Sequence, residues 1–304
     1  MSKSAFEKGE PGVYPDIPEP DYHALKLPSN SFVKAMEEYS PEHAYRWREE
    51  GRRPSKAQKL GTAAHVAVFE PERFPAVYMT SCPCSAVQKN GKVCGCPGQT
   101  RHDGEWFCGK HNKAAGDPDE LDREVLPPST YHDCNCIAER IHGHSDLGPA
   151  ILKEGENELS LIFVDERTGV KCKSRLDRWA STLEWVIDLK TSSKSVAPHK
   201  FAITSANFMY HHQGAFYRRA MQSLGRRVRK TCFAAIETAS PYGLCFFAMR
   251  DDKLDQYDLM IDANLRKYAR CEMTGEWPGY PPNIVMLDMP EWEERMLNGL
   301  EMPL

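Results

Sequence analysis

The chain has 304 residues, of which 41% are hydrophobic and 27% are charged, and its formal net charge is −4 at pH 7. These values predict a folded globular protein of one large or two small domains, and they argue against a disordered chain or a uniformly basic surface. The sequence contains neither an apolar run of membrane-spanning length nor a signal-peptide core, so we expect a cytoplasmic protein without a membrane partner.

Residues 1–28 are rich in proline, glycine and acids, which predicts an extended or disordered N-terminal arm. Helices are expected over 31–39, from Pro41 onward and over 55–69, because capping serines and prolines bound these segments. The later elements, in chain order, are a helix over 117–145, strands over 158–165, 170–180 and 183–191, a helix over 205–224, strands near 229–238 and 243–250, a helix over 252–273 and a Pro-rich tail over 281–304.

This order of elements predicts an α/β fold of the mixed α+β type, with a central mixed β-sheet flanked by helices in two or three layers. The main domain is expected over 29–280. Residues 80–115 break the pattern with Cys, Gly, Pro and Lys, and we interpret them as a small metal-binding insertion within that domain.

Two carboxylates and a lysine lie on neighbouring predicted strands. Asp188 and Lys190 are two residues apart and therefore project from the same face of a strand, and a turn after Trp179 can bring Asp177 alongside them. Carboxylate oxygens suit Mg²⁺ or Mn²⁺, and an ammonium group can orient water or help to deprotonate it. The pattern indicates metal-dependent phosphodiester hydrolysis, although an isolated Asp-x-Lys is usually an ordinary surface pair.

The insertion contains five cysteines between positions 82 and 108, and His111 follows three residues after the last of them. Disulfides are not expected in a cytoplasmic protein, so this density predicts a metal site. Our preferred Zn²⁺ ligands are Cys84, Cys94, Cys108 and His111. Cys82 or Cys96 could replace one of these cysteines, an iron-sulfur cluster is the alternative occupant, and Cys134 and Cys136 are interpreted as reduced, inert thiols.

Basic residues gather in two places where they could follow a phosphate backbone. The first surrounds Asp177, and the second is the run 218–230, for which a solvated helix face is the alternative interpretation. The candidate DNA contacts are Lys173, Arg175, Arg178, Arg218 and Arg219.

Several separated motifs support this chemistry: Leu27-Pro-Ser-Asn-Ser31, Leu60-Gly-Thr-Ala-Ala-His65, Gly169-Val-Lys-Cys-Lys-Ser-Arg-Leu-Asp-Arg178, Asp188-Leu-Lys-Thr-Ser192 and Gln213-Gly-Ala-Phe-Tyr217. Together they resemble the PD-(D/E)xK nuclease superfamily, in the branch of RecE-type (exonuclease VIII-like) and RecB-like nuclease domains. The resemblance implies a restriction-endonuclease-like core.

By this resemblance, His65, Asp177, Asp188 and the main-chain carbonyl of Leu189 would bind Mg²⁺ or Mn²⁺, and Lys190 would act on the nucleophilic water. Glu158 would serve a second metal ion, or else be a plain charge at a strand edge. Gln213 and Tyr217 share a helix face and would contact the DNA end or the active-site strands.

The resemblance further implies a Mg²⁺-dependent exodeoxyribonuclease that degrades one strand of linear double-stranded DNA from 5′ to 3′, leaving 3′ overhangs for single-strand annealing recombination. It also implies a ring-shaped homo-oligomer, either trimer or tetramer, a single-strand annealing protein as partner, and a phage or prophage origin in a bacterial cytoplasm. The alternatives are a single-strand or structure-selective endonuclease and a non-catalytic DNA-binding or recombinase-recruiting module. The intact His65, Asp177, Asp188 and Lys190 set disfavours the second of these.

Overall fold

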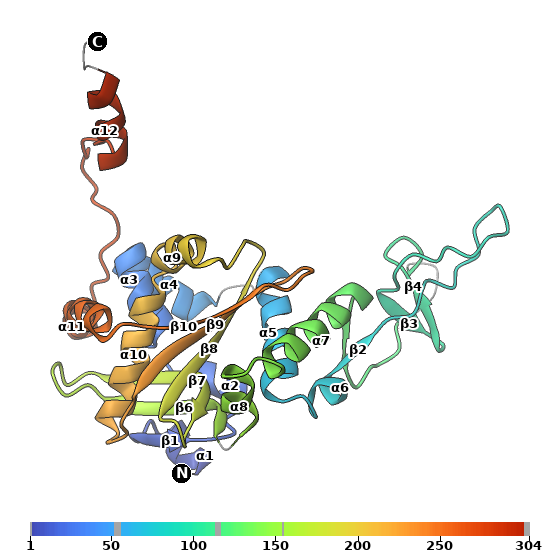
Figure 1. Cartoon of the computed structure of the whole chain (residues 1–304), viewed down its shortest axis with the longest axis horizontal. Helices are drawn as coiled ribbons and strands as arrows, with labels where there is room; N and C mark the ends of the chain where they lie inside the picture. The colour runs from blue at the N-terminus through green and yellow to red at the C-terminus, as the bar shows by residue number, and fades with distance from the viewer. Residues whose placement is uncertain (1, 52–55, 113–116, 154, 301–304) are drawn as a thin grey trace.

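A computed structural model describes residues 2–51, 56–112, 117–153 and 155–300. Its centre is a six-stranded sheet (Figure 1) in the order β1-β6-β7-β8-β9-β10. The strands are β1 (Gly12–Tyr14), β6 (Glu156–Val164), β7 (Lys171–Ala180), β8 (Trp185–Ser192), β9 (Lys230–Glu237) and β10 (Leu244–Ala248). Strands β8 and β9 run parallel, and the other described neighbours in this sheet run antiparallel. The predicted mixed sheet is therefore confirmed: the ends of β6 to β10 lie within two residues of those expected, whereas β1 was not predicted.

Helices cover both faces of this sheet, which gives three layers. One face packs on α3 (Asn30–Glu38), α4 (Pro41–Glu50), α10 (Tyr210–Ser223) and α11 (Asp251–Thr274). The other face packs on α5 (Lys56–Phe69), α7 (Pro128–His142) and α8 (Leu147–Leu152). The connection from β8 to its parallel neighbour β9 runs through α9 (Pro198–Asn207) and α10. The predicted α/β fold with a sheet flanked by helices is confirmed.

Local sequence signals explain where α3 and α4 begin. The Ser29 hydroxyl accepts a hydrogen bond from the main-chain N–H of Phe32 at the start of α3, and Ser40 caps α4 in the same way, followed by Pro41.

Two helix predictions are wrong in part. Residues 117–127 form no helix where they are described, because 124–126 pair as a strand, and the helix expected over 205–224 is divided near Met209, whose φ is 50°.

The N-terminal segment is folded, so the expected extended or disordered arm over 1–28 is wrong for residues 2–28. It forms α1 (Lys3–Glu7), β1 and α2 (Glu19–Ala24), and β1 pairs with β6. Phe6 and Tyr14 are fully buried with ring centroids 5.2 Å apart, and Tyr22 packs beside them over Ile162. A few large apolar residues thus order a segment whose average composition is polar.

The Cys-rich segment lies between two short parallel strands, β2 (Tyr78–Thr80), which follows α6 (Phe74–Val77), and β5 (Glu124–Leu126). It contains the hairpin β3 (Thr100–His102) and β4 (Glu105–Phe107), and Figure 1 shows it projecting sideways beyond α7. In the C-terminal part of the chain, the residues after α11 lead away from the sheet to α12 (Glu291–Leu300). Among the described residues, the helices are too short or too polar to cross a membrane.

Replacing Phe6 by alanine should lower the free energy of unfolding by about 3 to 5 kcal/mol, because the ring is fully buried against Tyr14 and Tyr22. Urea denaturation measures this change. The exposed neighbour Lys8 provides the control, since Lys8→Ala should change stability by less than about 0.5 kcal/mol. Equal stability of the two variants would contradict the packing of this segment on β6.

Candidate active site

An open cleft of about 1490 Å³ lies where β6, β7 and β8 meet α5 and α10. Its lining includes most of the catalytic residues predicted from the sequence: His65, Glu158, Asp177, Leu189, Lys190, Gln213 and Tyr217. The N-terminal segment supplies another wall through residues 15–19, Tyr22 and His23. Segments far apart in the chain therefore converge on one concave surface, which is the usual form of a substrate site.

His65, Glu158 and Asp177 each offer a ligand atom within 4.8 Å of the others. The Nδ1 atom of His65 lies 3.5 Å from Oδ2 of Asp177, and its Nε2 lies 3.2 Å from the carbonyl oxygen of Leu189. A carbonyl oxygen only accepts, so Nε2 carries a hydrogen, and Nδ1 is the ring nitrogen that faces Asp177 as a potential ligand atom. This donor set suits a divalent cation.

The main-chain N–H and carbonyl of Leu189 hold this arrangement together. Its N–H donates to Oδ2 of Asp177 at 2.9 Å, while its carbonyl accepts from His65. One main-chain unit of β8 thus fixes a side chain from β7 and another from α5. The role of this carbonyl as a metal ligand stays a prediction.

The strand ladder is interrupted at Glu158 and Asp177. Pairing is present on either side, at Asn157 with Arg178 and at Leu159 with Leu176, but not at the position between them. Glu158 has φ of 47°, in the left-handed region that residues with a β-carbon avoid. Such departures store strain and often occur where a side chain is redirected at a functional site.

Asp188 lies beside this group in a network of its own and is 1% exposed. Its Oδ2 lies 2.6 Å from Nζ of Lys190, so the two side chains do share a face of β8. Gln213 accepts from Lys190 at 2.7 Å and donates to Oδ1 of Asp188 at 2.9 Å, and the Tyr217 hydroxyl donates to the same oxygen at 3.2 Å. Gln213 and Tyr217 therefore contact the active-site strand, one of the two roles expected of them.

Tyr210, which was not among the residues predicted from the sequence, also contacts Lys190: its ring centroid lies 4.6 Å from Nζ of Lys190. The signal was present, because Tyr210 precedes Gln213 by three residues and so shares its face of α10. The face of the Tyr210 ring attracts the ammonium group of Lys190 and adds no further negative charge to the site.

Burial and like charge shape the protonation of this site. Burial, and then the charge of Asp177, raise the pKa of Glu158 to about 7 and that of Asp188 to about 6. Burial alone would lower the pKa of Lys190, but the adjacent carboxylates Asp188 and Asp177 raise it above its ordinary value. Lys190 is therefore a stable ammonium group, which favours orienting water or a phosphate oxygen over accepting a proton.

Most of the basic residues expected to bind DNA have other partners. Arg178 and Arg219 are 3% and 6% exposed, and Lys173, 5% exposed, donates to the carbonyls of Tyr22 and Leu25. Arg178 donates to Asn157 and the Lys153 carbonyl, and Arg219 pairs with Asp165, Asp258 and Asp262. The charged groups of these three residues are satisfied inside the protein, although Lys173 also lines the cleft, so their contact with DNA stays a prediction without support from the structure.

Arg175 and Arg218 differ from the other three. Arg175 lines the cleft and lies 4.0 Å from Glu158, while donating to the Ile17 carbonyl and Ser160. Arg218 pairs with exposed aspartates at the start of α11. DNA contact by these two residues stays a prediction.

In the insertion, the structure brings together the four preferred ligands Cys84, Cys94, Cys108 and His111, with ligand atoms within 4.8 Å of one another. Hydrogen bonds from the main-chain N–H groups of Lys110 and His111 lower the pKa of the Cys108 thiol to about 7. The other two cysteines of the segment, Cys82 and Cys96, are exposed.

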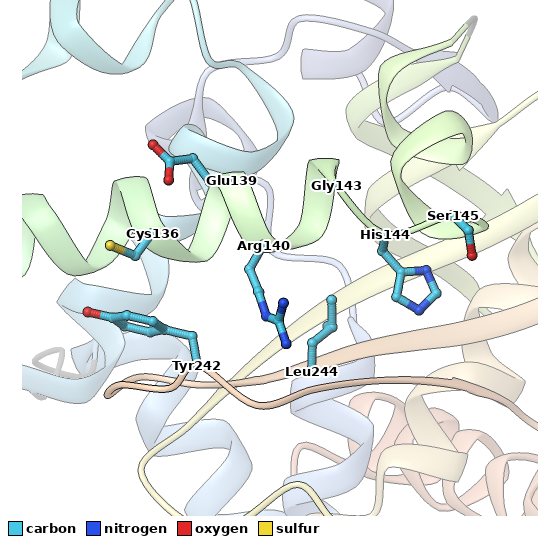
Figure 2. A pocket seen from close by; sticks show the side chains of 8 residues that line it. All are labelled: Cys136, Glu139, Arg140, Gly143, His144, Ser145, Tyr242 and Leu244. Carbon is cyan, nitrogen blue, oxygen red and sulfur yellow. The ribbon is translucent and has the colours of Figure 1, made fainter.

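A smaller hollow of about 570 Å³ lies between α7 and the β9–β10 connection (Figure 2). Cys136 and Tyr242 face each other at one end of it, and Arg140 and His144 lie farther along. Cys136 contacts His132 at 3.4 Å, while Cys134 is fully buried, and burial raises the pKa of its thiol to about 12. Neither of the two potential metal-ligand groups found among the described residues lies here, so the carboxylate cleft is the better candidate.

Comparisons with known proteins identify a family and a similar fold. The family model described as "PDDEXK-like domain of unknown function (DUF3799)" matches residues 29–288. A crystal structure from Eubacterium rectale, described as that of a "Putative exonuclease", is 14% identical and covers 92% of this chain and 98% of its own, with a TM-score of 0.57. A second structure, SSO0001, is 14% identical over 49% of this chain and 60% of its own, but its TM-score is 0.26. No curated protein matches the chain.

The stabilising effect of Mg²⁺ should increase with pH. In the metal-free protein, the pKa of Glu158 is raised from its ordinary value of 4.5 to about 7. The folded state therefore becomes less stable as the pH rises through this range, because Glu158 ionises less readily in the folded protein than in the unfolded chain. A bound cation offsets this loss, so adding Mg²⁺ should raise the melting temperature more at pH 8 than at pH 5.5.

Calorimetry of wild type and Asp177→Asn tests this expectation. The variant should lose most of the Mg²⁺-dependent shift, whereas Glu166→Gln, on the exposed β6–β7 turn, should retain it. A shift of the same size at both pH values would show that these carboxylates do not bind the cation.

Proposed function

The chain belongs to the DUF3799 family of PDDEXK-like domains, and from this we propose that it is a divalent-metal-dependent deoxyribonuclease. The observation that carries the proposal is the meeting of His65, Glu158 and Asp177 with the Asp188–Lys190 pair in one open cleft. Phosphodiester hydrolysis needs a cation site, a source of positive charge near the phosphate, and water. These residues can supply the first two.

The donor set fits Mg²⁺ or Mn²⁺. His65, Glu158 and Asp177 would hold the ion, and Asp188 lies next to them with its charge shared by Lys190. When bound, the ion would polarise the scissile phosphate and stabilise the charge that develops on its oxygens. The raised pKa values of Glu158 and Asp188 support this assignment, since crowded carboxylates ionise fully once a cation is near.

The protein's own residues would then position the reactants. Lys190 would place an ammonium beside the phosphate, where its attraction grows as negative charge develops in the transition state. Gln213 and Tyr217 would keep Lys190 and Asp188 in register, because each of the two side chains bonds Asp188 and Gln213 also bonds Lys190. No protein nucleophile takes part in this scheme.

The finer proposal is an exonuclease that degrades linear double-stranded DNA from 5′ to 3′ and leaves 3′ overhangs for single-strand annealing. Its support is the motif resemblance and the similar fold of the Eubacterium rectale protein. A ring-shaped homo-oligomer and an annealing partner belong to the same proposal, because a ring around the duplex would keep the enzyme on its substrate.

End-labelled DNA tests both levels of the proposal. Wild type with Mg²⁺ should release the 5′ label from linear duplex and leave covalently closed circles and circular single strands intact, and EDTA should abolish the reaction. Release of the 3′ label first would reverse the polarity, and cutting of circular single strands would establish the endonuclease. Binding of DNA without any cleavage would instead support the non-catalytic binding module.

Replacing Lys190 by alanine should reduce turnover by about 100-fold or more while leaving DNA affinity in EDTA nearly unchanged, because its contribution is made in the transition state. Single-turnover cleavage and fluorescence anisotropy measure the two quantities. The exposed Lys194, four residues later, gives the matched control, and Lys194→Ala should cleave at the wild-type rate. Equal activity of both variants would remove Lys190 from the mechanism.

Replacing Gln213 by alanine should reduce turnover by about 10- to 100-fold, because Lys190 and Asp188 each lose a hydrogen-bond partner. As a positioning residue, Gln213 should also affect the pH profile, shifting its acidic limb as Asp188 loses a donor to its ionised form. Gln222→Ala, on the exposed part of the same helix, serves as control. A profile that falls in height without shifting would point to a purely structural effect.

A further inference from the structure

The segment between β2 and β5 has almost no hydrophobic core of its own. Over 81–112 and 117–123, Trp106 is the one large apolar side chain that is buried, at 6% exposed. Regular structure there is limited to the β3–β4 hairpin and two isolated bridges, Pro83 with Pro97 and Val87 with Val93. A segment of this size does not fold on so little burial without a disulfide or a metal ion.

The cysteines of this segment are arranged for a metal ion and not for a disulfide. Nδ1 of His111 lies 3.4 Å from the sulfur of Cys84 and 3.4 Å from that of Cys108, and the sulfurs of Cys94 and Cys108 are 4.0 Å apart. A tetrahedral zinc ion, with bonds of about 2.3 Å to sulfur and about 2.0 Å to nitrogen, requires sulfur–sulfur separations of roughly 3.8 Å and sulfur–nitrogen separations of roughly 3.5 Å. The observed separations match this geometry.

The main chain on either side fixes the four ligands. The N–H of Cys84 donates to the carbonyl of Cys96 at 2.7 Å, and the N–H of Gly95 donates to the carbonyl of Cys84 at 3.1 Å, so the first two ligands lie on paired segments. Gly95 has φ of 66°, which allows the tight turn directly after Cys94. The second pair lies on a single turn after β4, where the N–H of His111 donates to the carbonyl of Cys108 at 2.9 Å.

The geometry also shows which cysteine of each Cys-x-Cys pair can be a metal ligand, which the sequence alone does not determine. Each of the two Cys-x-Cys pairs contributes one residue to the cluster and leaves the other, Cys82 or Cys96, exposed. The fourth position is occupied by an imidazole nitrogen. Three thiolates and one imidazole favour zinc, whereas an iron-sulfur cluster is normally held by four cysteines.

We propose that Cys84, Cys94, Cys108 and His111 bind one structural Zn²⁺, and that this ion folds the arm formed by residues 81–112. The site is separate from the carboxylate cleft, because none of its ligands lines that cleft and the arm projects from the side of the sheet (Figure 1). The donor set is complete without water, which is the character of a structural zinc site.

Zinc content of the purified full-length chain tests this proposal through matched variants. Plasma mass spectrometry should find about one zinc per chain in wild type, in Cys96→Ser and in Cys82→Ser, and close to none in Cys94→Ser. Asp177→Asn should keep its zinc, which shows that the ion is not in the carboxylate cleft. Equal loss in Cys94→Ser and Cys96→Ser, or iron in place of zinc, would overturn the ligand set.

Limited trypsin digestion tests the role of the ion independently of nuclease activity. Trypsin can cut at Lys89, Lys92 and Lys110, which are exposed on the arm. Cys94→Ser and chelator-treated wild type should both be cut there faster than Cys96→Ser. Added Zn²⁺ should protect only the chelator-treated wild type. Circular dichroism should show that the remaining domain of Cys94→Ser stays folded. An arm that resists trypsin equally well without zinc would refute the structural role.

Discussion

Buried negative charge at the centre of the sheet is the constraint on which the rest of the site depends. Asp188 is 1% exposed, and such a carboxylate is costly unless a cation and hydrogen-bond donors surround it. Lys190 provides the cation at 2.6 Å, and Gln213 and Tyr217 provide the donors. Helix α10 therefore cannot move along β8 without breaking these bonds, and the geometry of the cleft follows from the position of that helix.

A second acidic cluster, on the opposite side of α10, shows what a purely structural arrangement looks like. Arg219 pairs with Asp165 at 3.1 Å and with Asp258 at 2.7 Å, and it joins the β6–β7 turn to α11 through Asp262. Despite its burial, Asp262 has a lowered pKa, because Arg219 bonds to it, whereas Glu158 in the cleft has a raised pKa. In the structural cluster Arg219 and Arg167 pair directly with the aspartates. In the cleft Lys190 pairs with Asp188, while Glu158 and Asp177 remain crowded together where a cation could join them.

The parts of this molecule that follow from local periodicity and spacing were predictable from the sequence. Alternation located the strands and put Asp188 and Lys190 on one face, and spacing grouped the residues of the Cys-rich arm. The role of Arg219 could not be predicted, because its partners are distant in the chain: Asp258 and Asp262 lie 39 and 43 residues away on α11, and Asp165 lies on the β6–β7 turn. The left-handed backbone at Glu158 was equally hidden, since tertiary pairing and not residue preference imposes it.

The way the arm is attached has a consequence for how such a chain can diversify. Strands β2 and β5 are parallel, so the arm leaves the domain after Thr80 and the chain returns at Glu124, which pairs with Tyr78 on the strand it left. Neither core cluster on the faces of the main sheet draws a residue from between these two strands. Another module could therefore replace the arm at the same two attachment points without changing the sheet, the helices or the cleft.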